Sequence, residues 1–128
     1  MPNIVYFEIP ANNIDRAKHF YHALLGWKIE PTRVPMDQAG AAAMQYHDIS
    51  TGEVKEGNLS MGGLYKRQMA ELIIDHVAVE DVDMVLAKVE KLGGKIMIPK
   101  MKIQSVGLNA IIRDTEGNSL GLIQPEMK

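Results

Sequence analysis

The sequence contains no cysteine, and this absence excludes a disulfide framework and any chemistry at a thiolate. Aromatic residues make up only 5% of the chain, and no apolar run approaches the length of a membrane-spanning helix. Basic residues are scattered and the formal net charge is -2, so no nucleic-acid-binding surface is indicated. Glu8 and Pro10 interrupt the first apolar segment, which argues against a secretory signal. We therefore expect a cytoplasmic protein that binds neither nucleic acid nor a membrane.

The opening of the chain has the pattern of a strand, a helix and a second strand. Apolar side chains alternate over Ile4–Ile9, which predicts a strand that Pro10 ends. Asn12 or Asn13 is placed to cap the following helix, and Gly26 is placed to end it. A short strand over residues 27–30 completes the pattern. The apolar stripe of the helix is expected to comprise Ile14, Ala17, Phe20, Tyr21, Leu24 and Leu25.

The middle of the chain is less regular. Residues 32–40 are rich in loop-forming residues, and both a flap over a pocket and a surface loop without function are open interpretations. Strands are expected over residues 41–48 and 58–65, with a polar turn over 50–57. Gly62 and Gly63 fall inside the second of these strands, where glycine marks a bulge or a close approach by another group.

The opening pattern returns in the second half of the chain. A strand over residues 73–79 precedes a helix that Asp81 caps, and a strand over 95–98 follows. Two last strands, 106–113 and 119–124, flank a strong turn signal at residues 114–117. Each half therefore has the order βαβββ, and each is too small to be comfortably stable alone.

These patterns predict one α+β domain over residues 1–128, built from module 1 (1–66) and module 2 (67–128). The two modules are expected to share one curved mixed sheet, with a concave pocket on one side and the helices on the outer face.

Several short motifs together resemble one known superfamily. They are Phe7-Glu-Ile-Pro-Ala11, Arg16–Trp27 with its Phe-Tyr and Leu-Gly-Trp, Gly62-Gly-Leu64, Val79–Asp83, Leu92–Gly94 and Asp114-Thr-Glu-Gly-Asn118. The set resembles the vicinal oxygen chelate superfamily, which includes glyoxalase I, fosfomycin and bleomycin resistance proteins, and extradiol dioxygenases. The resemblance covers nearly the whole chain and is closest to small proteins related to lactoylglutathione lyase. It implies a small organic molecule as ligand and a homodimer as the assembly.

The resemblance also carries the superfamily's metal-ligand positions to this chain. In metal-dependent members, the first and last strands of each module supply the ligands, and the matching positions here are Tyr6, Gly63, Ile74 and Gly121. None of these is His, Glu or Gln, and one phenolate is too poor a ligand set for a divalent ion. We therefore expect no metal and no other cofactor. The two glycines leave space where ligands stand in relatives, which predicts a roomier cavity.

Glu8 and His76 are the predicted catalytic residues. Each stands two residues beyond a vacated ligand position, so strand alternation puts it on the same face as that position. The first strands of the two modules lie side by side in the superfamily, so Glu8 and His76 are expected to meet. A carboxylate beside an imidazole holds its tautomer and favours its charged form, as general-base chemistry requires. A purely structural pair between the modules is the other interpretation, and both interpretations place the two residues at the pocket.

The predicted ligand-binding residues complete the concave face. They are Tyr6, Met61, Gly63, Tyr65, Ile74, Asn109, Ile111 and Gly121. One function consistent with this set is a metal-independent enzyme, similar to a lyase or isomerase, that acts on a small organic molecule by acid–base chemistry. A second is a binding protein that sequesters its ligand without chemistry, as bleomycin resistance members do. An interaction domain with a collapsed pocket is a third.

Overall fold

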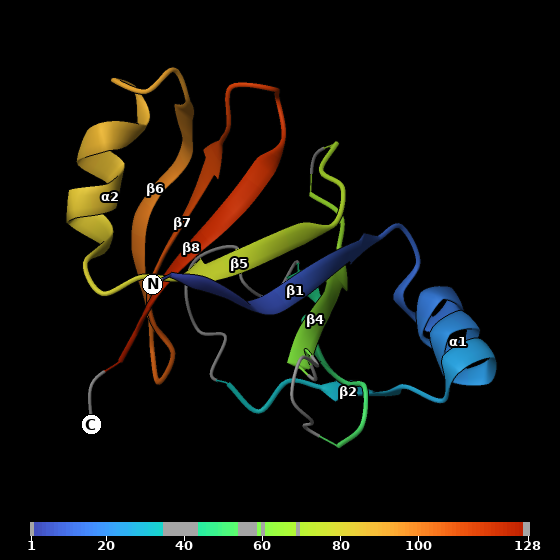
Figure 1. The fold of residues 1–128 in the computed structure, drawn as a ribbon. Helices are drawn as coiled ribbons and strands as arrows, with labels where there is room; N and C mark the ends of the chain where they lie inside the picture. Colours follow the sequence, from blue (N-terminus) through green and yellow to red (C-terminus); the bar gives the residue numbers. More distant parts are fainter. Residues whose placement is uncertain (1, 35–43, 54–58, 60, 69, 127–128) are drawn as a thin grey trace. The chain divides into compact units, whose positions relative to one another are not determined.

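The computed structural model describes residues 2–34, 44–53, 59, 61–68 and 70–126. The chain divides into a first unit of residues 6–73 and a second unit of residues 1–5 and 74–128. Each βαβββ half is present, and strand pairing is mixed parallel and antiparallel (Figure 1). The α+β class expected from the sequence is confirmed. No helix of the described residues is both long enough and apolar enough to span a membrane.

The first half of the chain places its strands in the order β2-β3-β4-β1. Its elements are β1 (Asn3–Ala11), α1 (Ile14–Leu25), β2 (Lys28–Pro31), β3 (His47–Ser50) and β4 (Met61–Lys66). β1 and β4 are parallel, and the other two pairs are antiparallel. The buried core consists of Phe7, Ile9, Ala11, Ile14, Ile29, Ile49 and Leu64. The core therefore lies on one face of this sheet, the face on which α1 packs through Ala17 and Tyr21.

Both ends of α1 form as the sequence predicts. The Asn13 side chain accepts a hydrogen bond from the Arg16 backbone N–H at 3.0 Å. Gly26 adopts the left-handed conformation with φ 74°, and its N–H bonds to the His22 carbonyl at 2.8 Å. A side chain with a Cβ would be strained at that φ, which explains the glycine.

The expected apolar stripe of α1 is only partly buried. Phe20, Leu24 and Leu25 are 56%, 64% and 52% exposed, whereas Ile14 is buried. Only part of the apolar stripe therefore packs on the sheet. Ile14, Ala17 and Tyr21 contact the core, while the other apolar side chains of the stripe are presented to the surface.

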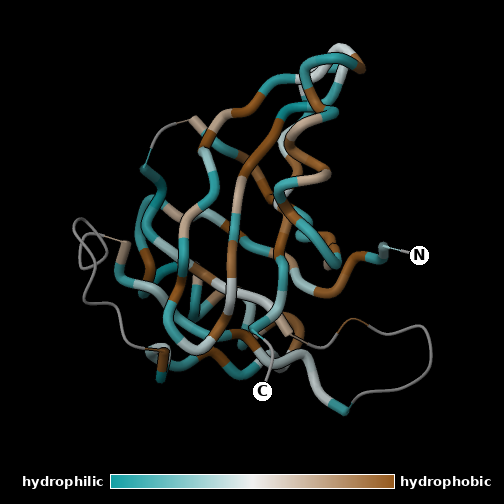
Figure 2. Tube along the Cα trace, turned by 90° about the vertical axis from the view of Figure 1, so that its left-hand side faces the viewer, coloured by the Kyte–Doolittle hydropathy of each residue, from teal (hydrophilic) through white to brown (hydrophobic). Residues whose placement is uncertain are grey.

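The second half has the strand order β5-β8-β7-β6. Its elements are β5 (Ile74–Ala78), α2 (Val82–Val89), β6 (Lys95–Ile103), β7 (Gly107–Arg113) and β8 (Ser119–Pro125). Figure 1 shows α2 alongside β6. The buried core of this half joins α2 to β7 and β8 and contains Val79, Val82, Ala110 and Leu122. The Asp81 side chain caps α2 by accepting from the Met84 N–H, as predicted. Hydropathy changes from residue to residue along the strands, as expected for strands with one face in a core (Figure 2).

Several strand boundaries differ from the prediction. β1 continues to Ala11, so the prediction that Pro10 ends this strand is wrong: Pro10 keeps its register with Tyr65 of β4. β6 continues through Pro99, because it is an edge strand and its register shifts between Ile98 and Met101, where proline removes no required ladder bond. β3 begins only at His47, since Gln45 has a positive φ of 47° that interrupts extended backbone. β4 begins at Met61. Of the expected loop over 32–40, residues 35–40 lie outside the described residues, as do 41–43, 54–58 and 60 of the neighbouring segments.

Candidate functional site

A polar face opposite the core of the first unit holds the candidate site. Tyr6 and Glu8 alternate with the core residues Phe7 and Ile9 along β1, so their side chains leave the sheet on the other side. The sheet register then sets Glu8 beside Gly63 of β4. Gly63 also pairs in register with Asp48 of β3, the strand on the side of β4 away from β1.

A chain of three side chains crosses this face. The Tyr46 hydroxyl donates a hydrogen bond to the Glu8 carboxylate at 2.6 Å, and the Tyr6 and Tyr46 hydroxyl oxygens are 2.7 Å apart. A phenol has a single hydroxyl hydrogen, and Tyr46 uses it on Glu8. The Tyr6 hydroxyl must therefore donate to Tyr46, and the chain has one direction, from Tyr6 through Tyr46 to Glu8.

The two phenols in this chain are held in their neutral form. Burial raises the pKa of Tyr6, and although its hydrogen bond to Tyr46 opposes the shift, the negative charge of Glu8 adds to it. Burial also raises the pKa of Tyr46, again with the Glu8 charge as the next cause. Both hydroxyls therefore keep their protons at neutral pH and donate hydrogen bonds along the chain.

Gly63 is a glycine because Tyr46 lies over it. A Cβ at position 63 would stand 1.9 Å from the Tyr46 hydroxyl oxygen and 2.3 Å from its Cζ, closer than any real contact. The same occurs in the second unit, where a Cβ on Gly121 would stand 2.1 Å from Nδ1 of His76. The space expected above these glycines is thus filled by the protein's own side chains. The prediction of a roomier cavity there is wrong.

Tyr65 packs against the ring of Tyr46. The two rings stack with centroids 6.2 Å apart and planes 13° apart. The Tyr65 hydroxyl donates to the Glu71 carboxylate at 3.1 Å, and burial followed by the Glu71 charge raises the pKa of Tyr65. Tyr65 is only 4% exposed, whereas Met61, on the same strand, is 62% exposed. The Tyr46 ring is therefore fixed by packing as well as by hydrogen bonds.

The predicted residues of the second unit lie on three neighbouring strands. His76 on β5 pairs in register with Gly121 on β8, and Gly121 pairs with Ile111 on β7. His76 is 2% exposed and Ile74 is 6% exposed, while Asn109 is partly buried. Glu8 belongs to the other unit, and its pairing with His76 stays a prediction.

The residues at the superfamily's metal positions do not fit a divalent ion. Within the described ranges, no group of three or more His, Cys, Asp or Glu side chains is placed to hold a metal. Gly63 and Gly121 have no donor atoms, and their space is taken by Tyr46 and His76. The side chains at these positions therefore do not form a ligand set for a divalent ion, and the reaction proposed below uses none.

Sequence reasoning missed Tyr46, the central residue of the site. The missing information was the register of β3, which begins just after Tyr46. The internal repeat contains the signal, because Asp48 pairs with Gly63 as Ile111 pairs with Gly121. Tyr46 is then the equivalent of Asn109, which the sequence did predict to face inward.

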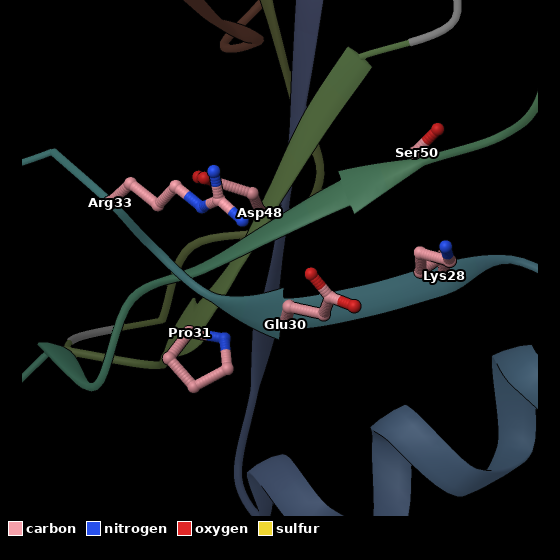
Figure 3. A pocket seen from close by; sticks show the side chains of 6 residues that line it. All are labelled: Lys28, Glu30, Pro31, Arg33, Asp48 and Ser50. Atoms are coloured by element: carbon pink, nitrogen blue, oxygen red, sulfur yellow. The ribbon is translucent and has the colours of Figure 1, made fainter.

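The first unit also has a small hollow that is lined by side chains of both charges. Its volume is about 90 Å³, and Lys28, Glu30, Arg33 and Asp48 are among its lining residues (Figure 3). In Figure 3 the Arg33 side chain extends towards Asp48, while Glu30 and Lys28 project from β2. Small-molecule sites usually exceed about 300 Å³. The hollow is therefore too small to hold an organic substrate by itself.

The family model described as the Glyoxalase/Bleomycin resistance protein/Dioxygenase superfamily matches residues 3–122. The chain belongs to this superfamily. The resemblance drawn from the sequence motifs is thereby confirmed. Among curated glyoxalase-superfamily relatives, Putative glyoxylase CFP32 of Mycobacterium bovis is 30% identical over 123 residues, which are 96% of this chain. The chain spans only 45% of that relative's length.

Two solved structures show the same glyoxalase-type fold. A hypothetical protein of Bacillus halodurans C-125 has a TM-score of 0.68 and 12% identity, covering 99% of this chain and 96% of its own. A methylmalonyl-CoA epimerase of Streptomyces coelicolor, solved with 2-nitronate-propionyl-CoA, has a TM-score of 0.67 and 15% identity, covering 97% of each chain. At these identities the likeness concerns the fold alone.

Proposed function

We propose that this protein is a metal-independent enzyme of the glyoxalase superfamily that moves a proton on a small organic molecule, as a lyase or isomerase does. The observation that carries the proposal is the directed chain from Tyr6 through Tyr46 to Glu8. It occupies the face on which the superfamily positions its metal ligands, and it offers a fixed carboxylate in their place.

Glu8 is the proposed base. Its carboxylate would accept a proton from a carbon next to a carbonyl group, while the electron pair of the broken C–H bond moves towards the carbonyl oxygen. Return of the proton at another position completes an isomerisation, and loss of a leaving group completes an elimination. His76 is proposed as the second catalytic residue. The predicted ligand-binding residues are proposed to contact the substrate.

Tyr46 is proposed as a positioning residue. It holds one Glu8 oxygen, and its own ring is held by Tyr65 and by the Tyr6 hydroxyl. Fixing the base in one orientation lowers the entropic part of the barrier. Tyr46→Phe should therefore lower kcat while leaving KM nearly unchanged, since the ring and its stacking remain.

The proposal is tested by exchange of carbon-bound protons in D₂O. A panel of small 2-oxo acids, aldehyde adducts and acyl thioesters is followed by proton NMR with the wild-type protein, Glu8→Gln and Glu30→Gln. Glu30 is the matched control, because it is an exposed carboxylate of the same unit on β2. Loss of the base should reduce exchange by about 10²–10⁴-fold, with Glu30→Gln unaffected. Equal exchange in all three proteins would refute Glu8 as the base.

Binding without chemistry is the second candidate function. It is favoured by the stacked Tyr46 and Tyr65 rings, a rigid flat surface of the kind that apolar ligands contact. Under this alternative, a compound of the panel binds tightly by calorimetry and shows no exchange. Its affinity would then be equal in the wild type and in Glu8→Gln.

A further inference from the structure

A groove beside α1 is separate from the Glu8 site. Its volume is about 360 Å³, within the range of small-molecule sites. Ile9 and Ala11 line it, and these belong to the core face of β1, whereas Glu8 leaves the strand on the other side. The groove is therefore on the opposite face of the first unit's sheet from the Glu8 carboxylate.

Two arginines give the lining of the groove its positive charge. Arg16 and Arg67 line it, and no carboxylate is among its lining residues in the described part of the chain. All three nitrogens of the Arg67 guanidinium donate to oxygens of the protein: Nε to the Asn12 side chain at 2.9 Å, Nη2 to the Pro10 carbonyl at 3.3 Å, and Nη1 to the Glu71 carbonyl. These bonds fix the guanidinium through uncharged acceptors. Arg16 is exposed on the first turns of α1.

Aromatic rings form the other part of the lining. Phe20 and Tyr21 pack edge to face with centroids 5.4 Å apart, and Phe20 is 56% exposed. Tyr21 in turn stacks on Trp27, with centroids 5.4 Å and planes 14° apart. The groove thus presents two guanidinium groups and two ring surfaces within one small volume.

We propose that this groove binds a small anion that carries a flat apolar group, such as an aryl phosphate or an aryl carboxylate. The exposed Arg16 guanidinium suits the planar, bidentate recognition of carboxylate and phosphate oxygens, and the fixed Arg67 guanidinium adds positive charge beside it. The exposed Phe20 and the Tyr21 ring accept the apolar part by stacking. A second copy of the chain is the competing occupant, because Phe20 also belongs to the exposed apolar end of α1.

Trp27 provides a direct readout of occupancy. It is the single tryptophan of the chain, and it stacks on the ring that lines the groove. Titration of the full chain with phenyl phosphate should therefore change tryptophan fluorescence saturably. Phenol lacks the anion and inorganic phosphate lacks the ring, so each should bind at least about tenfold more weakly.

Matched arginine variants separate a specific site from general charge. Arg16→Gln should weaken phenyl phosphate at least about tenfold, whereas Arg33→Gln, an exposed arginine of the same unit that lines the other hollow, should not. Circular dichroism verifies that both variants are folded. Absence of saturable binding, or equal loss in both variants, overturns the proposal. Light scattering that shows dimer mass lost in Phe20→Ser, with no phenyl phosphate binding to either form, assigns the groove to a second copy and also overturns it.

Discussion

Replacing Gly63 by alanine should expel Tyr46 from the site. Gly63 is not among the residues with positive φ, so its backbone accepts alanine without strain. The added Cβ, however, would stand 1.9 Å from the Tyr46 hydroxyl oxygen. The ring of Tyr46 must then leave Glu8, and both hydrogen bonds of the chain are lost.

These contacts set the expected loss of stability. A hydrogen bond to a charged group contributes roughly 1.5–3 kcal/mol, and a neutral one about 1 kcal/mol. Loss of the stack on Tyr65 adds roughly 0.5–1.5 kcal/mol. Gly63→Ala should therefore lower the free energy of unfolding by roughly 3–5 kcal/mol. Alanine also restricts the unfolded chain more than glycine does, which offsets up to about 1 kcal/mol of this loss.

A double-mutant cycle measured by urea denaturation tests this account. In the Tyr46→Ala background the clash is absent, so Gly63→Ala should cost less than about 1 kcal/mol. Gly62→Ala is the control, because its Cβ would meet the Phe7 ring at 2.4 Å on the core face, and its cost should be the same in both backgrounds. A coupling energy between Gly63→Ala and Tyr46→Ala below about 0.5 kcal/mol would refute the reasoning.

The tyrosine chain, the vacated metal positions and the exposed end of α1 each lead to a further measurement. Burial raises the pKa of Tyr46 in the folded state, so the stability that this residue contributes is complete below the unfolded pKa of about 10 and is lost as pH rises beyond it. In melts at several alkaline pH values, Tyr46→Phe should therefore reduce the loss of stability by up to about 1.4 kcal/mol per pH unit. An unchanged slope would contradict this. Glu8→Gln should shift the ring signals of His76 in NMR spectra if the two side chains meet, and should leave the ring signals of His19 unchanged. Protein purified without added metal should contain far less than one Ni, Zn, Fe or Mn per chain by elemental analysis, since the residues at the superfamily's metal positions offer no adequate donor set. We expect a homodimer that covers the exposed Leu24 and Leu25, which do not line the groove beside α1, so Leu24→Arg should convert dimer mass to monomer mass in light scattering. A wild-type monomer at micromolar concentration would remove this expectation.

In each module a large side chain lies over the glycine at the last-strand position, Tyr46 over Gly63 and His76 over Gly121, although the two side chains come from different positions of the repeat. In each module the family's last-strand ligand position is a glycine, and in each a side chain from a neighbouring segment takes the space. A packed interior tolerates few cavities, so removal of a ligand side chain is expected to be matched by a larger neighbour. The group that lies over the glycine is a phenol in the first module and an imidazole in the second.

The sequence by itself determined the elements and the superfamily. Strand alternation, the Asn13 and Asp81 caps and the Gly26 stop are local signals, because each depends on backbone groups only a few residues away. The repeat of these signals in both halves was sufficient to predict the βαβββ order. Local rules of this kind also placed Glu8 on the face opposite Phe7 and Ile9, as the structure confirms.

Only the tertiary structure decided what occupies the site. The hydrogen bond from Tyr46 to Glu8 joins residues 38 positions apart, and it depends on the pairing of β3 with β4, which no local signal fixes. The positive φ of Gln45 shifted the start of that strand past the predicted boundary. Burial of α1 was likewise decided by packing, since only Ile14, Ala17 and Tyr21 of its apolar stripe contact the core. Which long-range partner fills the space over a glycine is a property of register and packing, and for that reason Tyr46 emerged only from the folded chain.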